Sequence, residues 1–472
     1  DLTPQVQATY TLGWWQNDSV STVSSYLRNA AGNPVYSGNV NIGGMRYNLA
    51  NTDLNPSRGD QEHWLHGLSL KTKTGGEWDW ELAASLYDYG KDITRAPTVA
   101  VPTALSGGAG RITDMNGTGW HTLDLRGQWR PGLAQGQHEV SFGYHYDRYV
   151  LDTLVSDTSN WIAGSAGARR SAFAGKTEMH AIYAQDAWKF VRDWKLTLGG
   201  RIEHWQAFDG SISNQTTTLG YEERNETFFS PKAALSFQAS PVWALRASLA
   251  RAYRMPTVAE LYQGSINVNT IVNNDPNLKP EKALTGELTA ERDLGNGLLR
   301  ATLFQENAED ALYSQTNVTV TPNVTNIQNI DKIRTRGLEL VYQGMDVGIA
   351  GLDLTGSITY ADSEIMKNDK APSTVGNKQP RVPNWRTTLA ATYRQSDRLS
   401  YTLAGRYSGR QYNTLTNSDI NPNTYGGTSS FVVIDARVHY KVAKQWKAAL
   451  GVDNLNNRRY FVAHPYPQRT VV

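Results

Sequence analysis

The strongest constraint on this chain is a two-residue alternation of apolar and polar side chains that recurs along its length. Between Trp194 and Ile202, positions 194, 196, 198 and 202 are apolar, while Lys195, Thr197 and Arg201 are polar. Successive side chains of a β-strand point to opposite faces, so this pattern predicts strands with one apolar and one polar face. The same pattern recurs over residues 138–147, 399–408, 431–441 and 446–453.

Composition excludes the common alternatives to a sheet of this kind. Hydrophobic residues make up 39% of the 472 residues and the mean hydropathy is −0.50, yet aromatic residues reach 10%. We find no apolar run near the ~20 residues that a membrane helix needs. Low hydropathy with abundant aromatic residues is typical of a transmembrane β-barrel, in which only every second residue faces lipid. The formal net charge of +2 is too small to indicate nucleic acid.

Short and long connections alternate between the predicted strands. The short connections carry Gly, Pro, Asp or Ser, which suit tight turns, and lie at residues 73–77, 131–137, 191–193, 239–241, 293–297, 345–351, 395–398 and 442–445. The long polar segments lie at roughly 16–62, 91–118, 153–176, 209–225, 255–281, 314–332, 364–382 and 413–429. Short turns on one rim and long loops on the other are typical of an outer-membrane barrel, with the short turns periplasmic.

Tryptophans cluster beside the short turns. Trp78, Trp80, Trp194, Trp243 and Trp446 each follow a short turn. Trp129 and Trp188 each precede one. Because tryptophan prefers the membrane interface, this placement predicts an aromatic girdle at the periplasmic rim. The fold class is therefore all-β, a transmembrane antiparallel up-and-down β-barrel of about eighteen strands.

Several motifs resemble those of TonB-dependent outer-membrane receptors of the siderophore type. The first is one stretch that contains Ala252-Tyr253-Arg254-Met255-Pro256, Glu260-Leu261-Tyr262 and the run from Asn274 to Glu281. The second is Arg334-Thr-Arg336-Gly337-Leu-Glu339, which resembles the start of a strand in this family. Val452-Asp-Asn454-Leu455, Tyr460 and Pro467-Gln-Arg469 resemble its C-terminal signature. The motif residues are Tyr253, Arg254, Pro256, Glu260, Leu261, Tyr262, Pro276, Asn277, Leu278, Pro280, Glu281, Arg336, Gly337, Glu339, Asn454, Leu455, Tyr460 and Arg469.

The resemblance implies a barrel of twenty-two strands around a plug. We therefore expect residues 1–472 to be the barrel portion alone, from a first strand near Val6–Trp15 to a partial last strand at Gln468–Val472. The plug, about two hairpins and most of the final strand would lie outside the sequence. The implied partners are the TonB-ExbB-ExbD complex, acting through the absent plug, outer-membrane lipid and a small-molecule metal chelate. The resemblance also implies a monomer in the bacterial outer membrane, with no catalytic residues and no covalently bound cofactor.

The motifs suggest structural roles in the barrel wall. Pro256 and Pro280 lack a ladder donor, so they are expected to end the strands that flank their loop. Lumen-facing Arg336 and Glu339 are expected to pair across the wall. We favour the interpretation that these motifs preserve the barrel and touch no ligand.

Ligand capture would depend on arginines and tyrosines of the long loops. Guanidinium groups suit carboxylate or catecholate oxygens, and tyrosine rings stack on aromatic ligands. The candidates are Arg95, Arg111, Arg169, Arg170, Tyr262, Tyr313, Tyr412 and Tyr425.

Metal and enzyme signatures are weak. His63 and His66 are three residues apart, which in a strand places them on opposite faces, so we predict no metal site there. No histidine lies between Pro256 and Asp275, which weakens a haem hypothesis. We find no phosphate-binding loop and no nucleophile elbow, and predict no enzyme activity.

The predicted function is TonB-energised uptake of a scarce metal chelate, most consistent with an iron-siderophore. Cobalamin, haem, zinc or nickel chelates and oligosaccharides remain alternative substrates. A passive porin and a barrel that docks phages or protein partners remain alternative functions.

Overall fold

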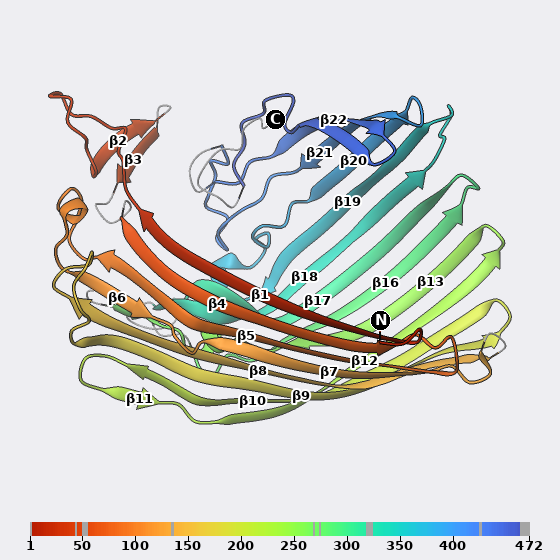
Figure 1. The fold of residues 1–472 in the computed structure, drawn as a ribbon, viewed down its shortest axis with the longest axis horizontal. Helices are drawn as coiled ribbons and strands as arrows, with labels where there is room; N and C mark the ends of the chain where they lie inside the picture. The colour runs from red at the N-terminus through yellow and green to blue at the C-terminus, as the bar shows by residue number, and fades with distance from the viewer. Residues whose placement is uncertain are drawn as a thin grey trace.

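One antiparallel sheet of 19 strands, strongly curved around a concave face, contains most of the chain (Figure 1). The computed structural model describes residues 2–42, 45–49, 55–133, 136–267, 270–272, 275–317, 324–423 and 427–462. Within these ranges, none of the helices has the length and hydropathy of a membrane span.

The sheet follows chain order, and each long strand pairs antiparallel with the next one. Its strands are β1 (Val6–Ser21), β4 (Ser57–Thr72), β5 (Trp78–Pro97), β6 (Gly110–Asp114), β7 (Gly119–Trp129), β8 (His138–Thr158), β9 (Arg169–Val191), β10 (Trp194–Ser213), β11 (Thr218–Gly220), β12 (Arg224–Ser240), β13 (Trp243–Arg254), β16 (Glu281–Asp293), β17 (Gly297–Asn317), β18 (Val324–Gly344), β19 (Leu352–Lys367), β20 (Trp385–Arg394), β21 (Leu399–Ser408), β22 (Phe431–Ala443) and β23 (Trp446–Val452). The predicted up-and-down meander is thus confirmed, and 19 strands agree with the predicted count of about eighteen.

Small elements lie in the long connections. Two hairpins are separate from the main sheet, β2 (Gly38–Ile42) with β3 (Met45–Leu49) and β14 (Ser265–Asn267) with β15 (Thr270–Val272). Among the described residues, the helical segments with defined bounds are α1 (Val258–Tyr262) and the 3₁₀ turns η1 (Thr103–Ser106) and η3 (Pro372–Thr374).

All eight predicted short turns join consecutive strands, but several of the long connections are shorter than predicted, whereas the last one, residues 409–430, is longer. β1 continues to Ser21, β9 already begins at Arg169, and β18 begins at Val324. The prediction used alternation of hydropathy, and these strand ends carry consecutive polar residues, such as Asp18-Ser19, Arg169-Arg170 and Asp331-Lys332, that interrupt the pattern. Pro256 follows the end of β13 and Pro280 immediately precedes β16, as expected.

The register separates the side chains into two faces. One cross-strand row is polar and consists of Lys195, Ser236, Arg246, Thr289, Thr302 and Glu339. The next row is apolar and consists of Leu196, Leu235, Ala247, Leu288, Leu303 and Leu338. Leu288 and Leu303 are 59% and 55% exposed, which fits a surface that contacts lipid. We call the apolar side the outer face and the polar, concave side the lumenal face.

The predicted aromatic girdle is present on the outer face beside the short turns. Trp78 stacks on Trp129 with ring centroids 5.5 Å apart, and Trp194 stacks on Phe237 at 4.3 Å. Trp446 is 72% exposed. These rings mark the short-turn rim as an interface between apolar and aqueous surroundings.

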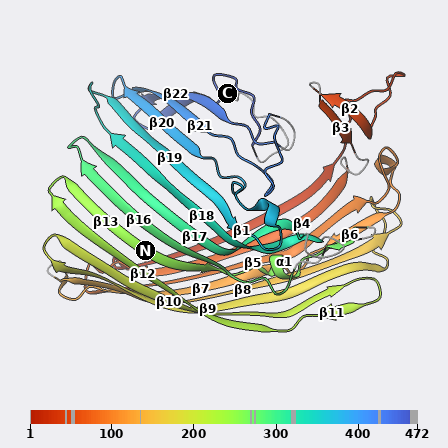
Figure 2. The ribbon, with the colours of Figure 1, turned by 180° about the vertical axis from the view of Figure 1, so that it is seen from behind.

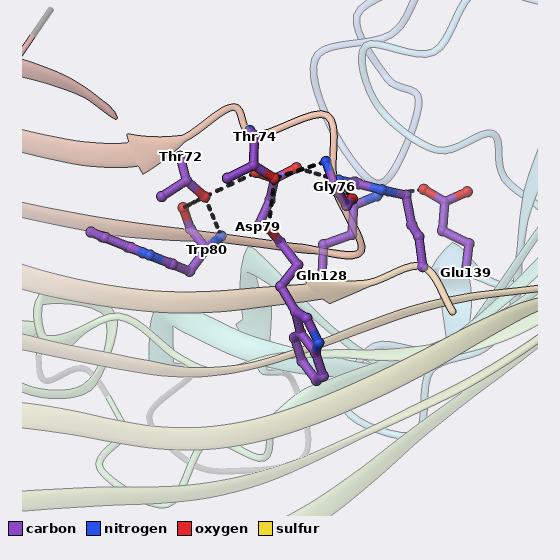
Figure 3. A network of polar contacts seen from close by, with 9 residues as sticks. Thr72, Thr74, Gly76, Asp79, Trp80, Gln128 and Glu139 are labelled. Carbon is purple, nitrogen blue, oxygen red and sulfur yellow. Dashed lines mark hydrogen bonds and ion pairs between the residues drawn. The ribbon is translucent and has the colours of Figure 1, made fainter. Parts of the chain in front are cut away.

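A polar network closes the turn between β4 and β5 at this rim (Figure 3). The Asp79 carboxylate accepts hydrogen bonds from the Thr74 backbone N–H at 2.8 Å and the Thr72 hydroxyl at 3.0 Å. Arg130, which directly follows β7, forms an ion pair with Asp79 and donates to the Gly76 carbonyl at 2.9 Å. Asp79 thereby connects the turn between β4 and β5 to the end of β7.

Replacing Asp79 with Ala is expected to lower the free energy of unfolding by about 1–2 kcal/mol, because several donors lose one shared acceptor. Urea unfolding in lipid vesicles, followed by tryptophan fluorescence, measures this change. Asp397→Ala is the matched control, since Asp397 is an exposed carboxylate in another short turn. Equal stability of the two variants would contradict this role of Asp79.

Candidate functional site

The motif loop between β13 and β16 folds back onto the lumenal face instead of extending away from the rim. Its helix α1 packs against β8, β9 and β10 (Figure 2). Thr257 caps this helix by accepting a hydrogen bond from the Glu260 N–H at 3.1 Å, and the Glu260 carboxylate accepts one from the Thr257 N–H at 2.8 Å. This reciprocal capping box fixes the start of a helix that would be too short to form alone.

Tyr262 anchors the helix in the wall. Its ring lies over Gly175 of β9 and Gly210 of β10, where an added Cβ would come within 2.1 Å and 2.3 Å of ring atoms. The side chain is 2% exposed and stacks on Tyr221 at 5.8 Å. Burial raises the pKa of the Tyr262 hydroxyl. The predicted ligand-stacking role of Tyr262 is therefore not available in this conformation, because the ring is enclosed by the wall.

Ionic contacts hold both ends of the motif loop. Arg254 pairs with Glu260 at 3.1 Å and with Glu281 at 3.6 Å. Arg224 of β12 donates to the carbonyls of Pro276 at 2.7 Å and Leu278 at 2.9 Å. Leu278 is fully buried in the same cluster as Leu261 and Tyr262.

The remaining residues of these motifs lie beside this network. Tyr253 packs its ring 4.7 Å from Phe228, and the Asn277 N–H donates to Asp275. The motif residues of the loop thus make packing and clamping contacts in this structure.

The Arg336 and Glu339 motif residues lie on opposite faces, so the predicted pairing between them is wrong. Their spacing of three residues inverts the side-chain direction in a strand. Arg336 is outward and pairs with Asp362 at 3.5 Å, whereas lumenal Glu339 accepts a hydrogen bond from the Thr359 hydroxyl at 3.3 Å. Gly337 is required between them because an added Cβ would lie 2.1 Å from the Tyr360 carbonyl oxygen.

The C-terminal motif also has a local structural role. Asn454 adopts a positive φ of 58° after β23, accepts the Arg458 N–H at 2.8 Å and donates its own N–H to Asp435 at 2.7 Å. The Leu455 N–H donates to the Ile434 carbonyl, and the Tyr460 ring packs 4.2 Å from Phe431. Arg469 lies outside the described residues.

The predicted loop arginines do not form a single cluster in the structure. Arg95 donates to the Gly164 carbonyl at 2.7 Å and Arg169 to the Asn214 carbonyl at 2.9 Å, so both pin neighbouring segments. Arg111 lies on β6 opposite Asp157 of β8, and Arg170 lies at the start of β9. The Nε atoms of Arg111 and Arg170 are buried without a hydrogen-bond partner.

The predicted tyrosines also lie apart. The Tyr313 hydroxyl accepts a hydrogen bond from Gln379 at 2.6 Å. Tyr412 carries the Arg410 guanidinium 4.7 Å above its ring. Tyr425 lies outside the described residues.

The structure brings together a set of aromatic side chains that the loop-based prediction missed. They lie on the lumenal face of β1, β4, β5, β7 and β8, toward the long-loop rim. We define this lumenal aromatic strip as Trp15, His63, Tyr87, Tyr89, Trp120 and Tyr149.

Close ring contacts make the strip continuous. His63 stacks on Tyr89 at 4.0 Å with 15° between the ring planes, and Tyr87 stacks on Trp120 at 4.4 Å and 5°. Trp15 lies 4.9 Å from His63 and is 46% exposed. Such a surface offers several aromatic faces for stacking.

A chain of polar contacts fixes the strip from one side. His63 is 7% exposed and contacts the Tyr87 hydroxyl at 3.0 Å and Asp92 at 3.1 Å through its two ring nitrogens. Gln61 donates to the other Asp92 oxygen at 3.1 Å and accepts a hydrogen bond from Asn17 at 3.0 Å. Because both nitrogens of His63 are engaged, its ring orientation is set before any ligand arrives.

The two-residue alternation of side chains could have indicated the strip, since Tyr87 and Tyr89 occupy lumenal positions of the same strand. The prediction considered only loop residues and therefore passed over them. His66 lies outward, where it contacts the Tyr10 hydroxyl at 2.8 Å, so the prediction that His63 and His66 face apart is confirmed. In the ranges that the structure describes, no group of three or more His, Cys, Asp or Glu side chains is arranged for a metal ion.

Comparison with known families decides the class of the barrel. The family model described as "TonB dependent receptor-like, beta-barrel" matches residues 3–455. The chain belongs to this family. It is an outer-membrane receptor barrel, and the family consists of transporters, not enzymes.

Individual relatives are distant. A probable TonB-dependent siderophore receptor, PiuA, of Acinetobacter baumannii is 27% identical over 343 residues, which cover 68% of this chain and 43% of that receptor. The crystal structure of that siderophore receptor superposes with a TM-score of 0.66 at 19% identity, covering 98% of this chain and 70% of the other.

Two receptors of Pseudomonas aeruginosa are also similar. A ferric enterobactin receptor is 22% identical, with 90% of this chain and 58% of the relative covered. A metal-pseudopaline receptor is 22% identical, with 72% and 48% covered. The chain thus spans about half the length of the curated relatives it matches.

Gly210→Ala is expected to destabilise the docked motif loop of this receptor barrel by about 1–3 kcal/mol, because the new methyl group overlaps the Tyr262 ring. Denaturant unfolding measures the stability, and limited proteolysis within residues 255–281 measures release of the loop. Gly405→Ala is the control, since an added Cβ at Gly405 meets nothing within 4 Å. If both variants resist protease equally, Tyr262 does not anchor the loop.

Proposed function

We propose that this receptor barrel takes part in TonB-energised uptake of a ferric siderophore that carries aromatic chelating groups. The supporting observation is the lumenal aromatic strip, which presents stacked, preoriented rings to the barrel interior. Aromatic faces favour planar aromatic ligands over aliphatic ones. Relatives named as siderophore and ferric enterobactin receptors support the same substrate class.

In this proposal the lumenal aromatic strip contacts the chelate during passage along the wall. The Tyr89 hydroxyl supplies a hydrogen-bonding group at a ring edge, whereas His63, whose two ring nitrogens contact Tyr87 and Asp92, holds the strip in position. The Nε atoms of Arg111 and Arg170 are buried without a hydrogen-bond partner, so we assign these two cations to the anionic oxygens of the ligand. Arg95 and Arg169 instead position the surrounding loops, and Tyr262 positions α1.

Energy would come from the TonB-ExbB-ExbD complex, acting through a plug inside the barrel. Family membership supports this partner and a gated route, and it argues against a passive porin. A non-aromatic metallophore is the alternative substrate, supported by similarity to the metal-pseudopaline receptor.

Growth assays separate the two substrate classes. A receptor-deficient strain that expresses the gene is expected to grow under iron limitation on ferric siderophores with catecholate or phenolate groups. Aliphatic hydroxamate and carboxylate siderophores are expected to give no growth beyond the empty-vector strain. Growth only on the aliphatic chelates, or on a nickel or zinc metallophore, would contradict the proposal.

Trp120→Ala is expected to weaken ferric-siderophore binding about 3- to 10-fold, because one stacking face worth roughly 0.5–1.5 kcal/mol is lost. Binding of ⁵⁵Fe-labelled chelate to whole cells at 0 °C measures the effect without transport. Trp64→Ala is the matched control, since Trp64 is adjacent to His63 in sequence and faces outward against Trp14. An equal loss in both variants would show that the strip has no specific role.

A further inference from the structure

The outer face carries an apolar groove that the transport proposal does not use. It has a volume of about 790 Å³ and runs across β10, β12, β13, β16, β17, β18 and β19. A second groove of about 520 Å³ shares Leu235, Ala247, Leu288, Leu303 and Leu338 with it, so the two are continuous.

Small residues create the groove between exposed leucines. Gly286 lies in register with Leu249. A Cβ atom added at Gly286 would lie 3.7 Å from the Leu249 side chain, which is an ordinary contact distance, so the space beside Gly286 is open. Ala247 opposes Leu288 in the next row, and Ala290 opposes Ala301 in the row after that. The depression therefore continues toward the short-turn rim over three successive rows, which suits an extended acyl chain.

The long-loop end of the groove is bounded by cations. Arg336 lies in the same cross-strand row as Gly286, and its side chain is 57% exposed. Asp362 accepts ion pairs from both Arg336, at 3.5 Å, and Lys378. One carboxylate neutralises only one of these two cations, so the site retains a positive charge.

The neighbouring outer rows add to this charge. Arg334 lies 4.0 Å from Glu364, and Lys282 and Lys332 flank Glu309. Together with Arg336, Lys378 and Asp362, the side chains named here comprise five basic and three acidic groups. The excess favours a ligand that carries more than one negative charge.

The orientation of the barrel decides which leaflet this site meets. Short turns face the periplasm in outer-membrane barrels, and the cations lie at the opposite end of the apolar rows. This end lies in the outer leaflet of an outer membrane, whose characteristic lipid is a multiply acylated, phosphorylated glycolipid. An arginine fork beside an acyl groove matches a sugar phosphate above hydrocarbon chains.

We propose that Arg336 and Lys378 bind a phosphate of this outer-leaflet glycolipid, and that the groove lined by Gly286 and Ala247 holds one of its acyl chains. The site lies on the outside of the barrel and is independent of the proposed substrate path. Its occupant is a lipid of the surrounding leaflet, not a transported chelate.

The test is native mass spectrometry of the receptor extracted from outer membranes in mild detergent, with quantification of bound glycolipid. The double variant Arg336→Gln/Lys378→Gln is expected to retain roughly tenfold less glycolipid, because the charge-assisted phosphate contacts are removed. Gly286→Leu is expected to reduce retention as well, since the new side chain fills the groove. Arg300→Gln is the control, because Arg300 is lumenal, 45% exposed and paired with Glu291 at 2.8 Å.

Heat-modifiable migration in gels verifies that every variant is folded. Unchanged glycolipid in the double variant, or equal loss in Arg300→Gln, would overturn the proposal. A competition with purified lipid A and phosphatidylglycerol in mixed micelles tests the identity of the lipid. Displacement of bound lipid A by an equal concentration of phosphatidylglycerol would overturn the assignment to a glycolipid, whereas selective retention of lipid A would support it.

Discussion

The backbone hydrogen-bond ladder is the interaction on which this structure depends. In hydrocarbon no water satisfies an unpaired N–H or C=O, so each strand must pair fully with its neighbours. Pairing fixes the register, and register fixes the face of every side chain, because a slip of one residue would turn a whole strand over. The polar row that ends at Glu339 and the apolar row that ends at Leu338 are the direct result. The lumenal aromatic strip and the outer groove follow from the same rule, one on each face.

Much of this arrangement could be predicted from the sequence. Alternation located the strands, and Gly-, Pro- and Asp-rich segments located all eight short turns. The ends of the strands toward the long-loop rim could not be found in this way. Beyond the lipid, the outer face no longer needs apolar residues, so β8 and β9 lose their alternation while they remain paired as far as Ser156 and Arg169. Alternating hydropathy therefore indicates the part of a strand that contacts lipid, and not the full length of the strand.

The site was less predictable, since it depends on contacts between distant segments. The sequence gives no local sign that Tyr262 would lie against Gly175 and Gly210, which are 87 and 52 residues earlier in the chain. The predicted pairing of Arg336 with Glu339 was wrong. Residues three apart in a strand point to opposite faces, and this rule, which correctly separated His63 from His66, should also have separated Arg336 from Glu339. The strip was missed because its members are strand residues, each unremarkable alone. Only the register brings Trp120 of β7 beside Tyr87 of β5.

The two faces of the wall carry different sets of side chains. The lumenal side has a rigid aromatic surface and a docked loop, and the outer side has charged rows above an apolar band. Strands position the aromatic strip and Arg336, whereas Lys378 lies in the connection between β19 and β20. The motif loop adds a third element, since its capping box, buried Tyr262 and Arg224 clamp hold it on the lumenal face close to the path that a ligand would take.

Single-cysteine spin labelling tests the assignment of faces most directly, and the chain contains no native cysteine to interfere. Labels placed in turn at Leu303, Leu338, Thr302 and Glu339 in lipid vesicles would be probed with oxygen and with a water-soluble nickel chelate. We predict that labels at the two leucine positions relax faster with oxygen and labels at the other two with nickel. Loss of this alternation, or its reversal, would contradict the register and with it the placement of both the aromatic strip and the lipid groove.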